Sequence, residues 1–175
     1  KIIIASGDMD TMQLVQDDNV VVYTLRKGLT DTVVFNEKAV YEKFGFSPAQ
    51  LVDYKGLRGD TSDNIIGIPG IGEKTATAMI KEFENIEGMY AYVDEVGVFT
   101  KTDPRFKNAA ITERIYNLLI THRDDALFSK ALATIRLDAP IHLEFEKIKP
   151  WHECVDIAAF HALIEEYELR SIRGK

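Results

Sequence analysis

The chain has 175 residues, of which 46% are hydrophobic, and this composition suits a globular protein with a core of its own. The formal net charge of −7 counts against a uniformly basic nucleic-acid surface, although local clusters of Lys and Arg remain open. No apolar run is long enough to span a membrane, and the single cysteine, Cys154, excludes an internal disulfide, so we expect a cytoplasmic protein.

The N-terminal portion predicts a small sheet. Residues 2–4 are three isoleucines, a short apolar run that is typical of a parallel-sheet strand buried on both faces. Because little that follows could cover such a strand, we expect this chain to be the C-terminal part of a longer protein. After a short helical stretch at 12–15, residues 19–25 and 32–35 favour a hairpin with its turn at 26–29.

The rest of the chain predicts mainly helices. Asn36 can cap a helix that runs to residue 44. Ser47 and Gln50 have the spacing of a capping box, with Pro48 at the first helical position, and this helix is expected to end near Leu57. The remaining predicted helices begin at Gly72 and cover residues 86–93, 109–119, 124–132 and 155–167.

Residues 65–72, IIGIPGIG, form the most distinctive segment of the sequence. Its three glycines allow positive φ and a close approach of the backbone to another surface. A helix that begins at Gly72 directs its free N–H groups toward any bound anion, and Lys74 and Thr75 add donors in the first turn. We therefore predict a sequence-independent grip on the DNA backbone. The predicted contact residues are Gly67, Ile68, Gly70, Ile71, Gly72, Lys74 and Thr75.

The same segment allows an additional ligand and two other interpretations. The carbonyl groups of the turn could also hold K⁺, bridged to a phosphate. A glycine-rich connector without a ligand is the plain alternative. A nucleotide-binding P-loop fits poorly, because Glu73 separates Gly72 from Lys74 and the preceding segment is predicted as helix rather than buried strand.

Four aspartates are candidate metal ligands. Asp8 and Asp10 alternate after the first strand, and Asp60 and Asp63 are three residues apart, which at a helix N-terminus would place both on one side. If the two loops converge, the carboxylates need a cation to remain ionised together. Hard oxygen ligands without His or Cys nearby favour Mg²⁺ or Mn²⁺. Loop solvation and helix capping are the alternative roles.

Two blocks of the sequence resemble the 5′→3′ exonuclease/flap endonuclease family, and within it the N-terminal nuclease domain of bacterial DNA polymerase I. They are IIIASGDMDTMQLV at 2–15 and YKGLRGDTSDNIIGIPGIGEKTA at 54–76. The resemblance extends over essentially the whole chain. It implies an α/β fold, with the end of a parallel-sheet, resolvase-like nuclease core over residues 1–55. Residues 56–175 are then a mostly helical region with a helix–three-turn–helix DNA-binding element at about 63–83.

The resemblance also implies a function. Members of the family hydrolyse DNA phosphodiesters with two divalent ions, and the substrate is duplex DNA with a 5′ end or flap. The four aspartates match the second metal site, and no catalytic group beyond the metal ligands is assigned. The first site and a basic helical arch match segments upstream of Lys1, so the chain alone is expected to be inactive or nearly so.

Partners and alternatives follow from the same resemblance. Polymerase domains are expected in the same full-length protein, and no membrane is expected as a partner. A stand-alone exonuclease, not fused to a polymerase, remains open. A non-catalytic module that binds duplex DNA through the hairpin alone also remains open; such a module has no need for two converging pairs of carboxylates.

Overall fold

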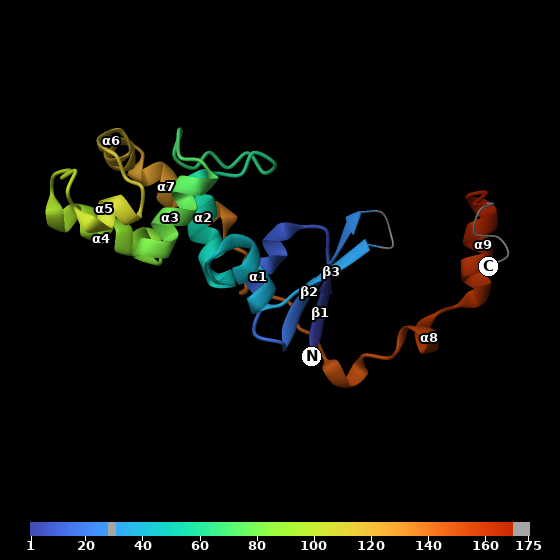
Figure 1. Cartoon of the computed structure of the whole chain (residues 1–175). Coiled ribbons are helices and arrows are strands. Elements are labelled where there is room, and N and C mark those ends of the chain that lie inside the picture. Colours follow the sequence, from blue (N-terminus) through green and yellow to red (C-terminus); the bar gives the residue numbers. More distant parts are fainter. Residues whose placement is uncertain (28–30, 170–175) are drawn as a thin grey trace. The chain divides into compact units, whose positions relative to one another are not determined.

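The computed structural model describes residues 1–27 and 31–169, and the fold is α/β, as predicted, with a small sheet followed by mostly helical chain (Figure 1). The chain divides into one compact unit from Lys1 to Arg136 and a second from Leu137 onward. Within the described residues no helix is both long and apolar enough to cross a membrane.

The sheet has three strands in the order β1 (Ile2–Ala5), β2 (Val20–Lys27), β3 (Asp31–Phe35). β1 pairs with β2 in parallel, and β2 pairs with β3 in antiparallel fashion. The predicted parallel pairing and the predicted hairpin are therefore both confirmed. Of the turn predicted at 26–29, Gly28 and Leu29 lie outside the described residues, and Lys27 belongs to β2.

The prediction that residues 2–4 form a strand buried on both faces is wrong for this structure. Ile2 is 57% exposed and Ile3 is 61% exposed, because β1 is an edge strand that pairs only with β2 among the described residues. An apolar run shows that a strand is suited to burial, but it does not show which layers cover it.

The first helices begin where their capping residues predict. Asn36 caps α1 (Glu37–Phe44), and its side-chain oxygen accepts a hydrogen bond from the N–H of Ala39 at 3.0 Å. The capping box is present before η2 (Pro48–Gln50), where the N–H of Ser47 donates to Oε1 of Gln50 at 2.9 Å. The chain continues directly into α2 (Leu51–Arg58).

Most helices after the hairpin also follow the prediction, but the short helices at Pro104–Asn108 and Trp151–Cys154 were not predicted. The helix predicted over 109–119 starts later, because Ala110 has a φ of +56° that interrupts it and Thr112 provides the cap. The helices of the first unit are α3 (Glu73–Phe83), α4 (Ile86–Val96), α5 (Pro104–Asn108), α6 (Glu113–Thr121) and α7 (Arg123–Ala133). The second unit contains η3 (Phe145–Lys147), α8 (Trp151–Cys154) and α9 (Ile157–Glu166).

Helix α2 lies in the core of the first unit, where it packs against α3 and α7. Asp53 on this helix is only 4% exposed. Its carboxylate accepts a hydrogen bond from the N–H of Ile86 at 2.9 Å and pairs with Nζ of Lys130 at 2.6 Å. A buried carboxylate with both partners in place resists displacement, because loss of either partner leaves an unpaired buried charge. This pairing holds α2 against α4 and α7, and α2 leads directly into the candidate site.

Candidate metal centre and hairpin

Asp8 and Asp10 are ordered by the start of a short 3₁₀ helix, η1 (Met9–Leu14). Asp8 is its N-cap, and its side chain accepts a hydrogen bond from the N–H of Asp10 at 2.9 Å. The N–H of Asp8 donates in turn to Oγ of Ser6 at 3.0 Å. Asp8 therefore acts as a cap in this structure, and Asp10 projects from the first turn.

Asp60 and Asp63 lie in a tight loop that follows the C-terminus of α2. Gly59, with a φ of +78°, turns the chain out of the helix. The loop is closed by two backbone hydrogen bonds of 2.8 Å, which join Asp60 and Ile65 in both directions. The prediction that the two aspartates stand at a helix N-terminus is wrong: the loop, and not helical spacing, places their side chains on one side.

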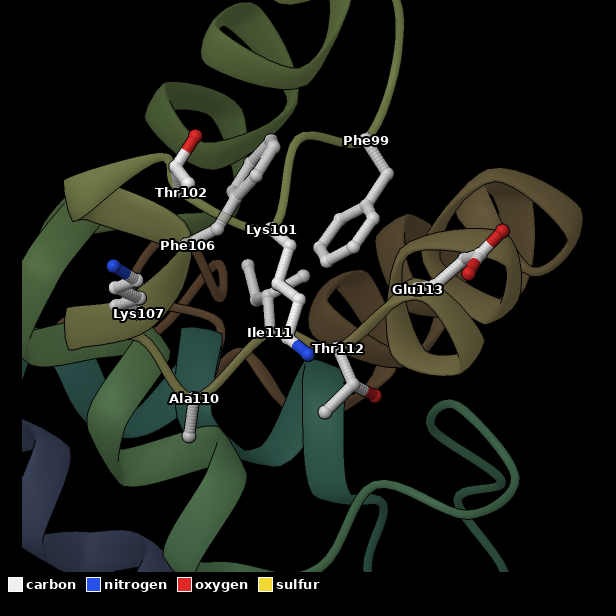
Figure 2. A pocket seen from close by; sticks show the side chains of 9 residues that line it. All are labelled: Phe99, Lys101, Thr102, Phe106, Lys107, Ala110, Ile111, Thr112 and Glu113. Atoms are coloured by element: carbon white, nitrogen blue, oxygen red, sulfur yellow. The ribbon is translucent and has the colours of Figure 1, made fainter.

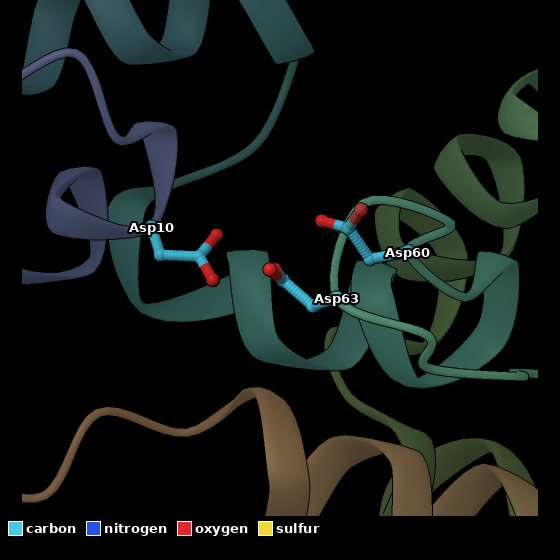
Figure 3. Close-up of side chains that lie close together, drawn as sticks. All are labelled: Asp10, Asp60 and Asp63. Atoms are coloured by element: carbon cyan, nitrogen blue, oxygen red, sulfur yellow. The ribbon is translucent and has the colours of Figure 1, made fainter.

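Asp10, Asp60 and Asp63 come together, although the first two are 50 positions apart in the sequence (Figure 3). One carboxylate oxygen from each lies within 4.8 Å of the others. Asp10 and Asp60 have side chains that are 18% and 20% exposed, and that of Asp63 is 53% exposed. Asp8 lines the same concavity, which has a volume of about 500 Å³, but among the described residues the close group consists of the other three.

Lys55 is a member of this cluster that the sequence did not reveal. Its Nζ contacts Oδ1 of Asp10, lies 2.7 Å from Oδ2 of Asp60, and lies 4.0 Å from Oδ2 of Asp63. Its side chain is only 12% exposed. The available signal was a lysine on α2 between the buried residues Tyr54 and Leu57, where an unpaired charge would be costly.

The charges of the cluster do not balance. Three carboxylates and the one ammonium group in contact with them carry a formal charge of −2, although Asp8, Lys43 and Arg58 also line the concavity. Burial by itself would raise the pKa of Asp60, but hydrogen bonds from Lys55 and Ser62 outweigh it and lower that pKa to about 2. Asp60 is therefore ionised throughout the neutral pH range and is an acceptor only.

The donor set fits a hard divalent cation. All three ligands are carboxylates, the class of ligand that Mg²⁺ and Mn²⁺ prefer. Opposite oxygens around Mg²⁺ lie about 4.2 Å apart, so oxygens already within 4.8 Å need only small side-chain rotations to bind the same ion.

The hairpin between α2 and α3 buries its apolar side chains and exposes backbone. Ile68 and Ile71 are 1% and 4% exposed, so they belong to the core. Gly67 is also buried, and its N–H donates to Oγ of Ser129 at 3.0 Å. Gly70, with a φ of +92°, is exposed at the tip of the turn. A ligand at this surface would therefore meet backbone groups and not isoleucine side chains.

The start of α3 completes the hairpin. Gly72 is the N-cap, and as a glycine it has no side chain that could accept a hydrogen bond from the first turn. Lys74 is exposed in that turn, and Thr75 is half-buried beside it. Uncapped N–H groups at the positive end of a helix, with a lysine next to them, favour a bound anion such as a phosphate.

A larger concavity lies elsewhere in the first unit, between the segment after α4 and the start of α6 (Figure 2). Its volume is about 680 Å³, and the rings of Phe99 and Phe106 together with Ile111 give it an apolar wall. Glu113 is the one carboxylate among its lining residues. A single carboxylate does not make a metal site, so the acidic cluster remains the candidate centre.

Comparisons with known proteins place the same segments in a family. The profile of the family described as "5′-3′ exonuclease, C-terminal SAM fold" matches residues 46–154. DNA polymerase I of Bacillus caldotenax is 42% identical over 145 residues, 83% of this chain and 15% of that protein. DNA polymerase I of Bacillus subtilis is 42% identical over 138 residues, 79% of this chain and 14% of that protein. The chain thus spans about one-seventh of the length of these relatives.

One solved structure adds a partial overlap. It is a bacteriophage T5 flap endonuclease in complex with DNA and metal ions, and it is 25% identical to this chain. The overlap covers 73% of this chain and 46% of that chain, with a TM-score of 0.46.

Proposed function

The chain belongs to the 5′–3′ exonuclease family, and on that premise we propose that it forms the part of a metal-dependent 5′ nuclease that grips duplex DNA and holds a divalent ion. The observation that carries this proposal is the convergence of Asp10, Asp60 and Asp63 immediately before the hairpin. Carboxylates within 4.8 Å of one another repel unless positive charge lies among them, and the three carboxylates outnumber the one ammonium group of Lys55.

The proposed roles follow from the positions of the groups. Asp10, Asp60 and Asp63 hold Mg²⁺ or Mn²⁺, with Asp8 beside them, and Lys55 offsets part of their charge. The bound ion would stabilise the negative charge that develops on a phosphate during hydrolysis. Three or four carboxylates provide ligands for one ion, so a two-ion reaction requires further ligands from another part of the full-length protein.

The hairpin fixes the duplex relative to that site. Backbone groups of the turn and the first N–H groups of α3, together with Lys74, hold phosphates without reading bases. The predicted contacts of the other hairpin residues are part of this proposal, and so is K⁺ bound by carbonyl groups of the turn. These residues are Gly67, Ile68, Gly70, Ile71, Gly72 and Thr75. DNA with a 5′ end or flap is the proposed substrate, and polymerase domains are proposed in the same protein because the relatives are DNA polymerases.

The division of the chain into residues 1–55, the end of the nuclease core, and residues 56–175, the helical DNA-binding region, stays a prediction. In this division α2 straddles the boundary, since it carries Lys55 and leads to Asp60. The proposed site then takes one carboxylate from the first part and two from the second.

One observation favours a second function, a duplex-binding module without catalysis. Nζ of Lys55 already pairs with Asp10 and Asp60, which is how a purely structural cluster of charges would be arranged. In that case the cluster would stabilise the loop before the hairpin and would bind no metal. The two functions differ in their dependence on divalent ions, which the experiments below measure.

The grip is tested by Lys74→Ala in the 175-residue chain. Because Lys74 is expected to contact backbone phosphate only, the variant should bind all duplex sequences more weakly and to the same degree. The slope of log affinity against log salt concentration should fall by about one unit. Fluorescence anisotropy with two labelled duplexes of unrelated sequence measures both effects. Lys107→Ala removes an equally exposed lysine from α5 and is the control; a loss confined to one duplex sequence would contradict the backbone grip.

A further inference from the structure

A third concavity of the first unit lies between the end of α1 and one face of α3. Its volume is about 400 Å³. Lys74, Thr77, Ala78 and Lys81 line it from α3, at the i, i+3, i+4 and i+7 positions that share one side of a helix. Lys43 and Phe44 line it from α1. With Glu73 as the one acidic lining residue, the three lysines give the concavity a formal charge of +2.

This positive concavity is local in a chain whose net charge is −7. Lys81 extends from α3 to Gly45, where a Cβ would collide with its ammonium group, so its charge lies at the C-terminus of α1. Lys43 Nζ lies 5.0 Å from the centre of the Phe35 ring and 5.2 Å from that of Phe44. Contact with two aromatic rings restricts the positions that this ammonium group takes.

The positive concavity and the acidic concavity share a wall. Lys43 and Phe44 line the positive concavity and also the one that contains Asp10, Asp60 and Asp63. Phe44 is half-buried and stacks on Phe46 with ring centres 5.7 Å apart, so this wall is anchored in the core. The phosphate backbone of a DNA strand that runs from the hairpin along α3 toward the carboxylates would pass Lys81 and then Lys43.

We propose that Lys43 and Lys81 bind DNA backbone phosphates that lie between the hairpin and the acidic centre. This inference rests on the proposed function, because it requires that the hairpin and the carboxylates act on the same DNA. Lys43 is the positioning residue at the point where the strand enters the acidic centre. It supplies positive charge beside three carboxylates that would otherwise repel a phosphate.

The test is the affinity of the 175-residue chain for a labelled duplex with a 5′ single-stranded arm, measured by anisotropy in Mg²⁺ over a range of salt concentrations. Lys43→Met and Lys81→Met keep much of the aliphatic stem and remove the charge. Each is expected to weaken binding by about three- to tenfold and to lower the salt slope by about one unit. Lys43→Arg should restore both values. Lys38→Met is the matched control, because Lys38 is on the same helix but its side chain is 82% exposed.

The possible outcomes distinguish a failure of this inference from a failure of the proposed function. If Lys43→Met and Lys81→Met bind like the unchanged chain while Lys74→Met binds more weakly, the connecting path is wrong and the hairpin grip stands. If Lys74→Met also has no effect, the grip and the path are both wrong. If polyglutamate competes with the DNA and shows the same dependence on Lys43 and Lys81, the surface takes acidic peptides and the inference is overturned. Circular dichroism melting identifies any variant that fails to fold, in which case Lys81→Gln and Lys43→Gln replace it.

Discussion

Asp60→Asn, placed in a full-length nuclease that contains this chain, is expected to slow DNA cleavage by at least about a hundredfold, because it removes one proposed ligand of the ion that would stabilise the reacting phosphate. The Asp60 carboxylate lies beside those of Asp10 and Asp63, and its pKa of about 2 keeps it ionised at neutral pH. An amide of the same shape carries no charge and binds divalent ions less well. Asp63→Asn should act in the same direction.

Measuring the affinity of the same variants for duplex DNA distinguishes a role of Asp60 and Asp63 in cleavage from a structural role. Affinity for DNA should change by less than about twofold in both variants, because carboxylates make no favourable contact with phosphate. The measurements are single-turnover cleavage of a 5′-labelled flap substrate and anisotropy of the same DNA. Asp94→Asn is the control, since Asp94 is an exposed partner of Arg123. Equal losses of cleavage and of binding in Asp60→Asn would indicate that the cluster only supports the loop.

Gly67→Ala is expected to lower the free energy of unfolding by about 3 kcal/mol or more, because it combines a strained backbone with overpacking. Gly67 has a φ of +62°, a region that residues with a Cβ rarely adopt. A Cβ there would lie 2.2 Å from the backbone nitrogen of Gly59 and 2.6 Å from the carbonyl carbon of Arg58. Neither backbone atom can move without displacing the loop that carries Asp60.

The matched control for this variant is Gly72→Ala. Gly72 has a φ of −96°, and no atom lies within 4 Å of a Cβ added there. Its cost should not exceed about 1 kcal/mol, the usual difference between residues at an N-cap. Urea unfolding followed by circular dichroism measures both variants. Similar stability of the two would show that the close approach of Gly67 and Gly59 does not constrain the hairpin.

Features that depend on neighbours in the chain were predictable from the sequence. Asn36 and the pair Ser47 and Gln50 satisfy N–H groups three residues away, so the same residue types predict the same helix starts in any fold. The turn between α2 and α3 was predictable for the same reason, because Gly67 and Gly70 supply the positive φ that it needs.

Features that depend on packing were not predictable in the same way. Whether Ile2 and Ile3 are covered depends on layers that their own sequence does not specify. The contact between Lys55 and Asp10 joins residues 45 positions apart. Asp60 and Asp63 were assigned to a helix start because of their spacing, although the polar residues between them offer no apolar face for a helix to bury. Their convergence required the backbone pairing of Asp60 with Ile65.

The grip and the acidic centre are joined by short covalent connections. Asp60 follows α2 by two residues, and only nine residues, 64–72, separate Asp63 from the start of α3. The backbone of Gly59 packs against that of Gly67 within this span. In the proposed function, a duplex held by the hairpin would therefore lie at a defined distance from the carboxylates, which is the condition for cutting one phosphate and not its neighbours.

The central claim is that Asp10, Asp60 and Asp63 bind a divalent cation. Its most direct test is a titration of the 175-residue chain with Mn²⁺, in which electron paramagnetic resonance measures the free ion. We expect the chain to bind one Mn²⁺ at this site at about millimolar concentration or below, a range typical of small carboxylate sites. Asp60→Asn combined with Asp63→Asn should abolish that binding, and Asp94→Asn should leave it intact. A chain that binds no Mn²⁺, or a double variant that binds it equally well, would contradict the claim.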